Sequence, residues 1–376
     1  MNGIYNTQIV MNISKRFYDF NLEDYREKRK VKNKYQRWFL STIPVYINER
    51  LNRELIIQAI NIIQQETCVR FRVVNQIIMG IPGIRFSPGE RCCSQVGMVN
   101  RRRFQNIFIA GYCQTLGVIQ HEILHALGID HEHNRIDRDQ YVTILTDNVE
   151  ESKINDFNIP WILDSNTFGI PYDYGSIMHY DMNTFSKNNG PTVIPKHDLY
   201  RKTIGHTYKL SFLDIKTVNM LYCQFTCSSS LNCKNKSYQN PNICSKCKCI
   251  EGYVGNDCSR FTVNMSPCGK ARKIAHRRIQ EIRAEGLLNC SYHLSTQRHR
   301  KIVIKISYVH IYPYTHQCCS PENCLEVKYW EDKSVTGARF CGTENNVLFY
   351  SKSNIVLVYF RSTHYINRFK IFFKKY

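Results

Sequence analysis

The sequence predicts three folded parts in series: an α+β domain of two lobes, a small disulfide-rich module and an all-β sandwich. Three observations predict this order. Apolar residues recur at helical spacing in residues 52–68 and 118–127, and an alternating stretch at residues 44–47 suggests a first strand. Six of the 17 cysteines crowd into residues 227–258. Between residues 302 and 373, short apolar segments alternate with turns, which is typical of a β-sandwich.

Composition places the chain in an oxidising compartment. It has 376 residues, of which 43% are hydrophobic, enough for two or three domains with buried cores. Seventeen cysteines are far more than a reduced cytosolic protein of this size usually holds, so we expect a secreted, extracellular protein with disulfide bonds. Asn235, Asn264 and Asn289 lie in N-glycosylation sequons, as does Asn12.

The beginning of the sequence disagrees with secretion. Residues 1–20 contain no apolar core of a signal peptide. We give the cysteines more weight and expect a truncated or trimmed start, with a cytosolic protein as the alternative. No run of 18 apolar residues appears, so no transmembrane segment is expected.

The net charge of +20 is concentrated near the C-terminus. Residues 260–376 hold 20 lysines and arginines against 7 aspartates and glutamates, a net charge of +13. Such a surface would attract acidic matrix or sulfated glycans, although a merely solvated surface explains the charge as well. We expect no nucleic-acid partner, because no nucleic-acid motif is visible and the compartment is oxidising.

A pair of histidines in residues 118–127 predicts a metal site. His121 and His125 are four residues apart, so their imidazoles lie on one helical face. Two nitrogens at this spacing can bind one metal ion at about 2.0–2.1 Å. Glu122 can reach the remaining coordination position without ligating the metal. A polar helix face explains these five residues alone equally well.

The pattern continues and becomes much more specific. Gly128 suits a left-handed helix end, and the turn it permits can bring His131 to the same ion. The full HExxHxxGxxH pattern is a metzincin signature. Residues 131–139, HEHNRIDRD, resemble the HE-x-x-R-x-DRD extension of the astacin family of zinc endopeptidases. Residues 172–180, YDYGSIMHY, look like the SxMHY Met-turn of that family.

The resemblance implies a fold and an activity. The fold would be a two-lobed metzincin catalytic domain followed by EGF-like and CUB modules. The activity would be hydrolysis of protein or peptide substrates with one Zn²⁺ per subunit. The implied ligands are His121, His125 and His131. An inactive protease fold that presents its modules to partners is the rival interpretation.

The resemblance also implies roles for four further residues. Glu122 would be the general base. Tyr180 would ligate the resting zinc and then hydrogen-bond the transition state, or else be a core aromatic. Met178 would form the apolar floor beneath the metal. Glu132 would pair with the N-terminal ammonium released when a propeptide is removed.

The resemblance to the astacin family also implies domain boundaries. Residues 1–36, with the basic run 26–34, would be a propeptide remnant or linker, and residues 37–224 the catalytic domain, ending in a helix at 210–222. Within it, residues 98–110 would form the edge strand that pairs with substrate. The arginines at 101–103 would then favour acidic substrates or simply protect the edge from aggregation.

The remaining boundaries and the disulfides depend on the cysteines. Residues 225–260 would be the EGF-like module, whose six cysteines allow 15 pairings, and residues 261–376 the CUB domain. Cys92 or Cys93 would pair with Cys113, and Cys341 with Cys318, Cys319 or Cys324. The other pairs implied are Cys68–Cys223, Cys227–Cys244, Cys233–Cys247, Cys249–Cys258 and Cys268–Cys290.

Overall fold

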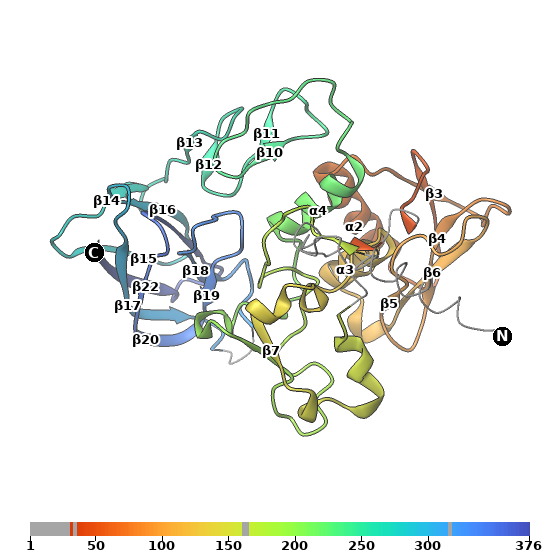
Figure 1. Cartoon of the computed structure of the whole chain (residues 1–376), viewed down its shortest axis with the longest axis horizontal. Helices are drawn as coiled ribbons and strands as arrows, with labels where there is room; N and C mark the ends of the chain where they lie inside the picture. The colour runs from red at the N-terminus through yellow and green to blue at the C-terminus, as the bar shows by residue number, and fades with distance from the viewer. Residues whose placement is uncertain (1–30, 33–35, 160–164, 315–317) are drawn as a thin grey trace, which may run out of the picture.

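The computed structural model describes residues 31–32, 36–159, 165–314 and 318–376. The expected propeptide remnant or linker, with its basic run, lies almost wholly outside this part of the chain. In Figure 1 the N-terminal α+β part lies on the right and the β-rich C-terminal part on the left. The short hairpins β10–β11 and β12–β13 lie above and between them.

The N-terminal part contains a five-stranded sheet in the order β3-β2-β4-β6-β5. Neighbouring strands pair in parallel, except that β5 runs antiparallel to β6. Helices α2 (Arg53–Glu66) and α3 (Leu116–Ala126) pack on the sheet through one hydrophobic core. The strands are β2 Ile43–Ile47, β3 Phe71–Val74, β4 Gly83–Pro88, β5 Cys93–Ser94 and β6 Phe104–Ile109.

Helix α2 illustrates why these residues form their elements. Asn52 caps its first turn by accepting a hydrogen bond from the Leu55 backbone N–H at 3.0 Å. Its buried side chains recur at three- and four-residue intervals, so they share one face against the sheet. They are Ile56, Ala59, Ile60 and Ile63. The helix falls within the range that the apolar spacing predicts.

The expected edge strand needs a correction. Strand β6 begins only at Phe104, and the exposed arginines 101–103 lie in the bend before it. Furthermore β5 pairs with the outer side of β6 at Ile107 and Phe108, so β6 is not the outermost strand of the sheet.

Beyond α3 the described chain forms mostly short 3₁₀ turns and a small antiparallel pair of strands, β7 and β9, until helix α4 (Phe212–Tyr222). Ser211 and Asp214 form a capping box at the start of α4. The strands are β7 Val142–Ile144, β8 Ser165–Asn166, which pairs with β1 Val31–Lys32, and β9 Val193–Pro195. The helix begins two residues later than the sequence predicts.

The C-terminal part is a sandwich of two sheets, five-stranded β14-β16-β21-β18-β19 and four-stranded β15-β22-β17-β20. Five strands match the segments that the sequence predicts at residues 302–306, 325–329, 347–350, 355–360 and 369–373, and β14, β15, β16 and β19 are additional. The bounds are β14 Arg272–Ile274, β15 Gln280–Glu285, β16 Asn289–Ser295, β17 Ile302–Ile311, β18 Cys324–Lys328, β19 Ala338–Phe340, β20 Gly342–Tyr350, β21 Ile355–Arg361 and β22 Arg368–Lys375. The predicted fold class is therefore confirmed.

Between the two parts, residues 227–261 form two pairs of two-residue strands and three disulfides. The pairs are β10 Tyr238–Gln239 with β11 Cys247–Lys248, and β12 Tyr253–Val254 with β13 Arg260–Phe261. So little regular structure cannot bury a sizeable core, and the disulfides compensate for it.

Seven disulfides join fourteen of the cysteines. Two of them settle the alternatives left open by the sequence: Cys92 pairs with Cys113, and Cys319 with Cys341. Cys93, Cys318 and Cys324 are free thiols. The five other disulfides are Cys68–Cys223, Cys227–Cys244, Cys233–Cys247, Cys249–Cys258 and Cys268–Cys290.

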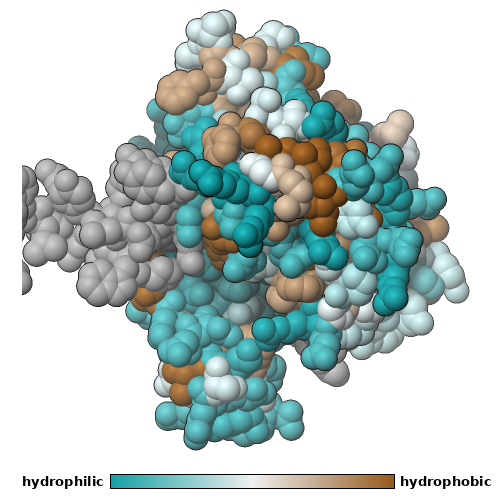
Figure 2. Space-filling view, turned by 90° about the vertical axis from the view of Figure 1, so that its right-hand side faces the viewer, coloured by the Kyte–Doolittle hydropathy of each residue, from teal (hydrophilic) through white to brown (hydrophobic). Residues whose placement is uncertain are grey.

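One face of the molecule shows how hydrophilic and hydrophobic residues are distributed over the surface. Hydrophilic residues cover most of the face in Figure 2, and hydrophobic residues gather in a band across its upper half. Among the described residues, no helix is both long and apolar enough to cross a membrane.

Candidate metal centre

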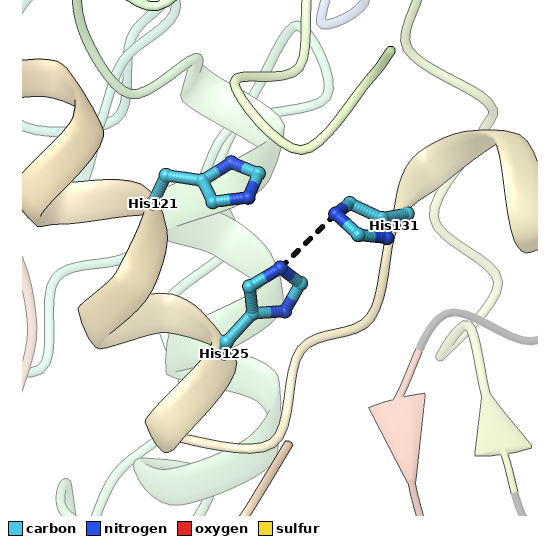
Figure 3. Close-up of side chains that lie close together, drawn as sticks. All are labelled: His121, His125 and His131. Carbon is cyan, nitrogen blue, oxygen red and sulfur yellow. Dashed lines mark hydrogen bonds between the residues drawn. The ribbon is translucent and has the colours of Figure 1, made fainter. Parts of the chain in front are cut away.

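Three histidine side chains converge beside helix α3. His121 and His125 project from successive turns of the helix toward His131, which follows it on a loop (Figure 3). The Nε2 atoms of His125 and His131 lie 3.1 Å apart. The ligand atoms of the three histidines all lie within 4.8 Å of one another, close enough to hold one metal ion. Among the described residues, no other group of three histidine, cysteine or acidic side chains is this close.

The turn after α3 explains how His131 reaches this place. Gly128 has φ +99°, a left-handed conformation that is costly for a residue with a Cβ. Its N–H donates to the His125 carbonyl at 2.8 Å, and the Ile129 N–H donates to the Leu124 carbonyl at 3.0 Å. These two bonds form a Schellman motif, which reverses the chain. His131 is thereby directed back toward the helix.

Backbone carbonyls fix the tautomer of the two helical histidines. His121 Nδ1 lies 2.8 Å from the Ile177 carbonyl oxygen, and His125 Nδ1 lies 2.8 Å from the Ile129 carbonyl oxygen. A carbonyl only accepts, so both Nδ1 atoms carry the proton and both Nε2 lone pairs face the centre. Burial, with a contribution from His125, lowers the pKa of His121 to about 3. The imidazole is therefore neutral, as a metal ligand must be.

Glu122 lies at the edge of this cluster. The residue is buried, and its Oε2 atom has no hydrogen-bond partner in the described structure. Burial raises the pKa of the Glu122 carboxyl to about 8. A buried carboxyl oxygen without a partner is costly unless a water or a cation interacts with it. The donor set of three imidazoles, with the unpartnered Oε2 atom of Glu122 on helix α3, fits a zinc ion with an open position.

Tyr180 packs over the same cluster. Its ring stacks on His133 with centroids 3.8 Å apart, and its centroid lies 4.5 Å from that of His131. Phe157 and Phe185 contact the ring edge-on. Burial raises the pKa of the Tyr180 hydroxyl, so the hydroxyl stays protonated at neutral pH and can donate a hydrogen bond.

The Met-turn, residues 176–180, forms hydrogen bonds with the segments that carry the three histidines. Met178 is fully buried, and its carbonyl accepts a 2.9 Å hydrogen bond from the Glu132 N–H. Its neighbour Ile177 supplies the carbonyl that orients His121. The Met-turn thus contacts both segments that carry the histidines.

Asp214, which no sequence pattern singles out as a site residue, anchors the Met-turn. Asp214 is fully buried and accepts hydrogen bonds from the Ser176 hydroxyl at 2.5 Å, the Ile177 N–H at 2.9 Å and the Ser211 N–H at 2.9 Å. The available signal was the Ser-x-x-Asp pattern at residues 211–214, which indicates a capping box. That pattern predicts a helix start but gives no indication of the second role.

Glu132 lies in a buried ion-pair cluster. Its Oε1 accepts from Arg135 Nη1 at 3.3 Å and from the Asp173 N–H at 2.8 Å. Arg135 also forms a 2.9 Å ion pair with Asp137. The pairing of Glu132 with an N-terminal ammonium, which the family resemblance implies, stays a prediction.

Comparison with known families adds to this geometry. The model of the astacin peptidase family matches residues 30–223, more than half of the chain. The chain belongs to the astacin family. A CUB domain model matches residues 283–373, within the sandwich. The histidine cluster and Met-turn lie inside the astacin match, and we call residues 36–223 the astacin region.

Curated relatives include zinc metalloproteinases of nematodes. Zinc metalloproteinase nas-34 of Caenorhabditis elegans is 35% identical over 328 residues, covering 86% of this chain and 53% of that protein. Zinc metalloproteinase nas-36 of Haemonchus contortus is 33% identical over 314 residues, covering 82% and 51%. This astacin therefore spans about half the length of the curated relatives that it matches.

Among solved structures, high choriolytic enzyme 1, a hatching enzyme zinc-protease from Oryzias latipes (medaka fish), is 32% identical. The match covers 51% of this astacin chain and 92% of that chain, with a TM-score of 0.44.

Proposed function

We propose that this chain is a zinc-dependent endopeptidase that hydrolyses peptide bonds in extracellular proteins. The observation that carries the proposal is the convergence of three imidazole side chains, one of which adjoins Glu122, whose buried Oε2 atom has no hydrogen-bond partner among the described residues. Family membership supports it, because the relatives at about one-third identity are named zinc metalloproteinases. We assign one Zn²⁺ per chain to His121, His125 and His131.

The chain's own residues supply the rest of the chemistry. A zinc ion, when bound here, would act as a Lewis acid and lower the pKa of a water toward about 7. A cation held by the histidines would lower the pKa of the Glu122 carboxyl again, because an adjacent positive charge favours the ionised form. The Glu122 carboxylate would then take a proton from the attacking water and pass it to the leaving amine nitrogen. The Tyr180 hydroxyl donates a hydrogen bond to the carbonyl oxygen as negative charge develops there. Met178 and the Asp214 anchor hold the histidines in place.

We propose domain boundaries at 37–224, 225–260 and 261–376. Residues 225–260 are assigned as an EGF-like module, supported by three disulfides that link its six cysteines in first–third, second–fourth and fifth–sixth order. Seven disulfides also support secretion. Activation from a zymogen and glycosylation at the sequons belong to the same proposal. The basic C-terminal part would bind acidic matrix or sulfated glycans.

Glu122→Gln tests the central proposal. The amide keeps the size of the side chain but cannot take a proton from water. We expect zinc content to stay at one per chain while cleavage of a peptide library, measured by mass spectrometry, falls by about 10²–10⁴-fold. Substantial remaining turnover would exclude Glu122 as the base. An inactive parent that binds one zinc would favour the rival interpretation, a non-catalytic binding protein.

A further inference from the structure

A loop of the sandwich packs directly behind the Met-turn. This loop, residues 329–337, connects β18 to β19. Its Thr336 N–H donates a 3.0 Å hydrogen bond to Asp173 Oδ1 of the astacin region, and both residues are buried. Val335 shares a small hydrophobic core with Ile170 and Leu213. The contact is therefore buried and includes a directional hydrogen bond to the Asp173 carboxyl group.

Asp173 connects this loop to both segments of the metal centre. Its N–H donates to Glu132 Oε1 at 2.8 Å, immediately after His131. Its carbonyl accepts from the Ser176 N–H at 3.0 Å, at the start of the Met-turn. The next residue, Ile177, places its carbonyl oxygen 2.8 Å from His121 Nδ1. A shift of Asp173 would therefore move the supports of two ligands together.

Gly175 shows how closely the two parts approach. A Cβ added to Gly175 would lie 2.4–2.6 Å from three side-chain atoms of Thr336, which are its nearest neighbours. Gly175 is not among the glycines with positive φ, so its backbone conformation is open to other residues. The sandwich, and not the local backbone, is what excludes a side chain at this position.

The interface extends beyond this point. The Arg339 N–H donates to Thr203 Oγ1 at 2.9 Å, and Lys202 Nζ forms a 2.6 Å ion pair with Glu344. Tyr200, fully buried, donates through its hydroxyl to the Thr336 carbonyl at 3.4 Å. These contacts fix the position of the loop relative to the astacin region.

We propose that the 329–337 loop is a built-in support of the metal centre, acting through Asp173 as a positioning residue. The sandwich would thereby contribute to metal affinity and turnover as well as to any binding of partners. This inference rests on the proposed zinc site. It predicts that loosening the contact between Thr336 and the Gly175 segment changes the geometry of the histidine ligands without touching any of them.

A double-mutant cycle in the full chain tests this proposal. Gly175→Ala introduces the clash, and Thr336→Gly makes room for the added methyl group. We expect Gly175→Ala to weaken zinc affinity, measured by competition with a chelator, about tenfold, at the low end for groups that orient metal ligands. It should shift the visible absorption of the Co²⁺-substituted protein and lower kcat more than it raises KM. Adding Thr336→Gly should reverse these changes.

Gly111→Ala is the matched control, because a Cβ there would meet nothing within 4 Å. The proposal is overturned if Gly175→Ala leaves the Co²⁺ spectrum and zinc affinity unchanged, or if Thr336→Gly fails to reverse the effects. Should Gly175→Ala not fold, Asp173→Ala replaces it, with Asp173→Asn as the conservative variant that keeps an acceptor oxygen. An unchanged spectrum in Asp173→Ala would likewise overturn the proposal.

The readouts separate this inference from the proposed function. Zinc affinity and the Co²⁺ spectrum are measured without a peptide substrate. A parent chain that binds zinc but does not cleave peptides would count against the endopeptidase, and the metal-binding arms would still decide the role of the loop. A parent that binds no zinc would refute both proposals.

Discussion

The side chain of Asp214 accepts a hydrogen bond from the Ile177 backbone N–H at 2.9 Å, joining the first turn of α4 to the Met-turn. The Ile177 carbonyl in turn lies 2.8 Å from His121 Nδ1. The C-terminal helix of the astacin region therefore holds a histidine on α3 that precedes it by more than ninety residues.

Removing the Asp214 carboxylate should destabilise the protein strongly. In Asp214→Ala three buried donors lose their acceptor, and we expect the free energy of unfolding to fall by about 3 kcal/mol. Urea denaturation monitored by circular dichroism measures the change. Asp214→Asn, which keeps one acceptor oxygen, should lose clearly less. Equal stability of Asp214→Ala and the parent would contradict the anchoring role.

The Tyr180 hydroxyl is expected to matter in the transition state. Tyr180→Phe keeps the stacking on His133 but removes the donor, so kcat should fall roughly 10²-fold while KM changes little. Steady-state kinetics on one cleaved peptide measures both parameters. Tyr208→Phe, at a half-exposed position, is the control and should behave as the parent. An unchanged kcat in Tyr180→Phe would exclude the tyrosine as the donor.

Metal removal should affect turnover and stability together. Treatment with a chelator should abolish cleavage and lower the melting temperature, because zinc bound only to the folded state stabilises it by mass action. Adding back one equivalent of Zn²⁺ should restore both. In His125→Ala, zinc should produce no comparable rise in melting temperature. A chelated chain that cleaves peptides as before would refute the zinc mechanism.

Acid sensitivity should depend in part on His206, which lies at the contact with the sandwich. His206 Nε2 lies 2.8 Å from the Gly175 carbonyl, and burial, with a smaller contribution from Arg339, lowers the pKa of His206 to about 3. The unfolded chain binds a proton below about pH 6.5, whereas the folded chain does not. The contribution of His206 to the free energy of unfolding is therefore complete above about pH 6.5. Below this pH the free energy of unfolding falls by about 1.4 kcal/mol per pH unit because of this group.

His206→Gln tests that expectation. The glutamine does not titrate. Between pH 7 and pH 5 the free energy of unfolding of the variant should therefore fall by roughly 2 kcal/mol less than that of the parent. Urea unfolding at the two pH values gives the comparison. Between pH 7 and pH 8 the two proteins should show the same dependence on pH. A parallel acid dependence would show that His206 is charged in the folded state.

Reductant should unfold the C-terminal parts of the chain. Residues 227–258 are held by three disulfides around a core that includes Ile250 and Tyr253, with Leu357 and Tyr359 contributed by the sandwich. Loss of a bridge that closes a loop of about ten residues costs about 2–3 kcal/mol. Limited proteolysis should show early cleavage in residues 225–376 after reduction, and an identical pattern with and without reductant would contradict this.

The sequence was sufficient for features that depend on local spacing. His121 and His125 occupy one helix face because of the 3.6-residue period, and Gly128 marks the turn because its φ is positive. The two motifs identified the family. The strands β14, β15, β16 and β19 were not predicted, since their segments are polar or only three residues long and lack clear alternation.

Only the tertiary structure decided the contacts between distant backbone groups. The acceptors of His121 and His125 are carbonyl oxygens, and every residue has a carbonyl, so no side-chain pattern reveals them. The choice of Cys92 over Cys93, and of Cys319 among three candidates, required sulfur positions in space.

The sequence by itself thus predicted the histidine cluster, the family and the order of the parts, because each is encoded in short-range spacing. The tertiary structure decided what surrounds that cluster: the Asp214 side chain accepts from the Ile177 N–H, and Thr336 packs against Gly175. Thr336 and Asp173 are 163 residues apart. Such contacts arise from the packing of whole domains, and neither residue type carries a local signal for them.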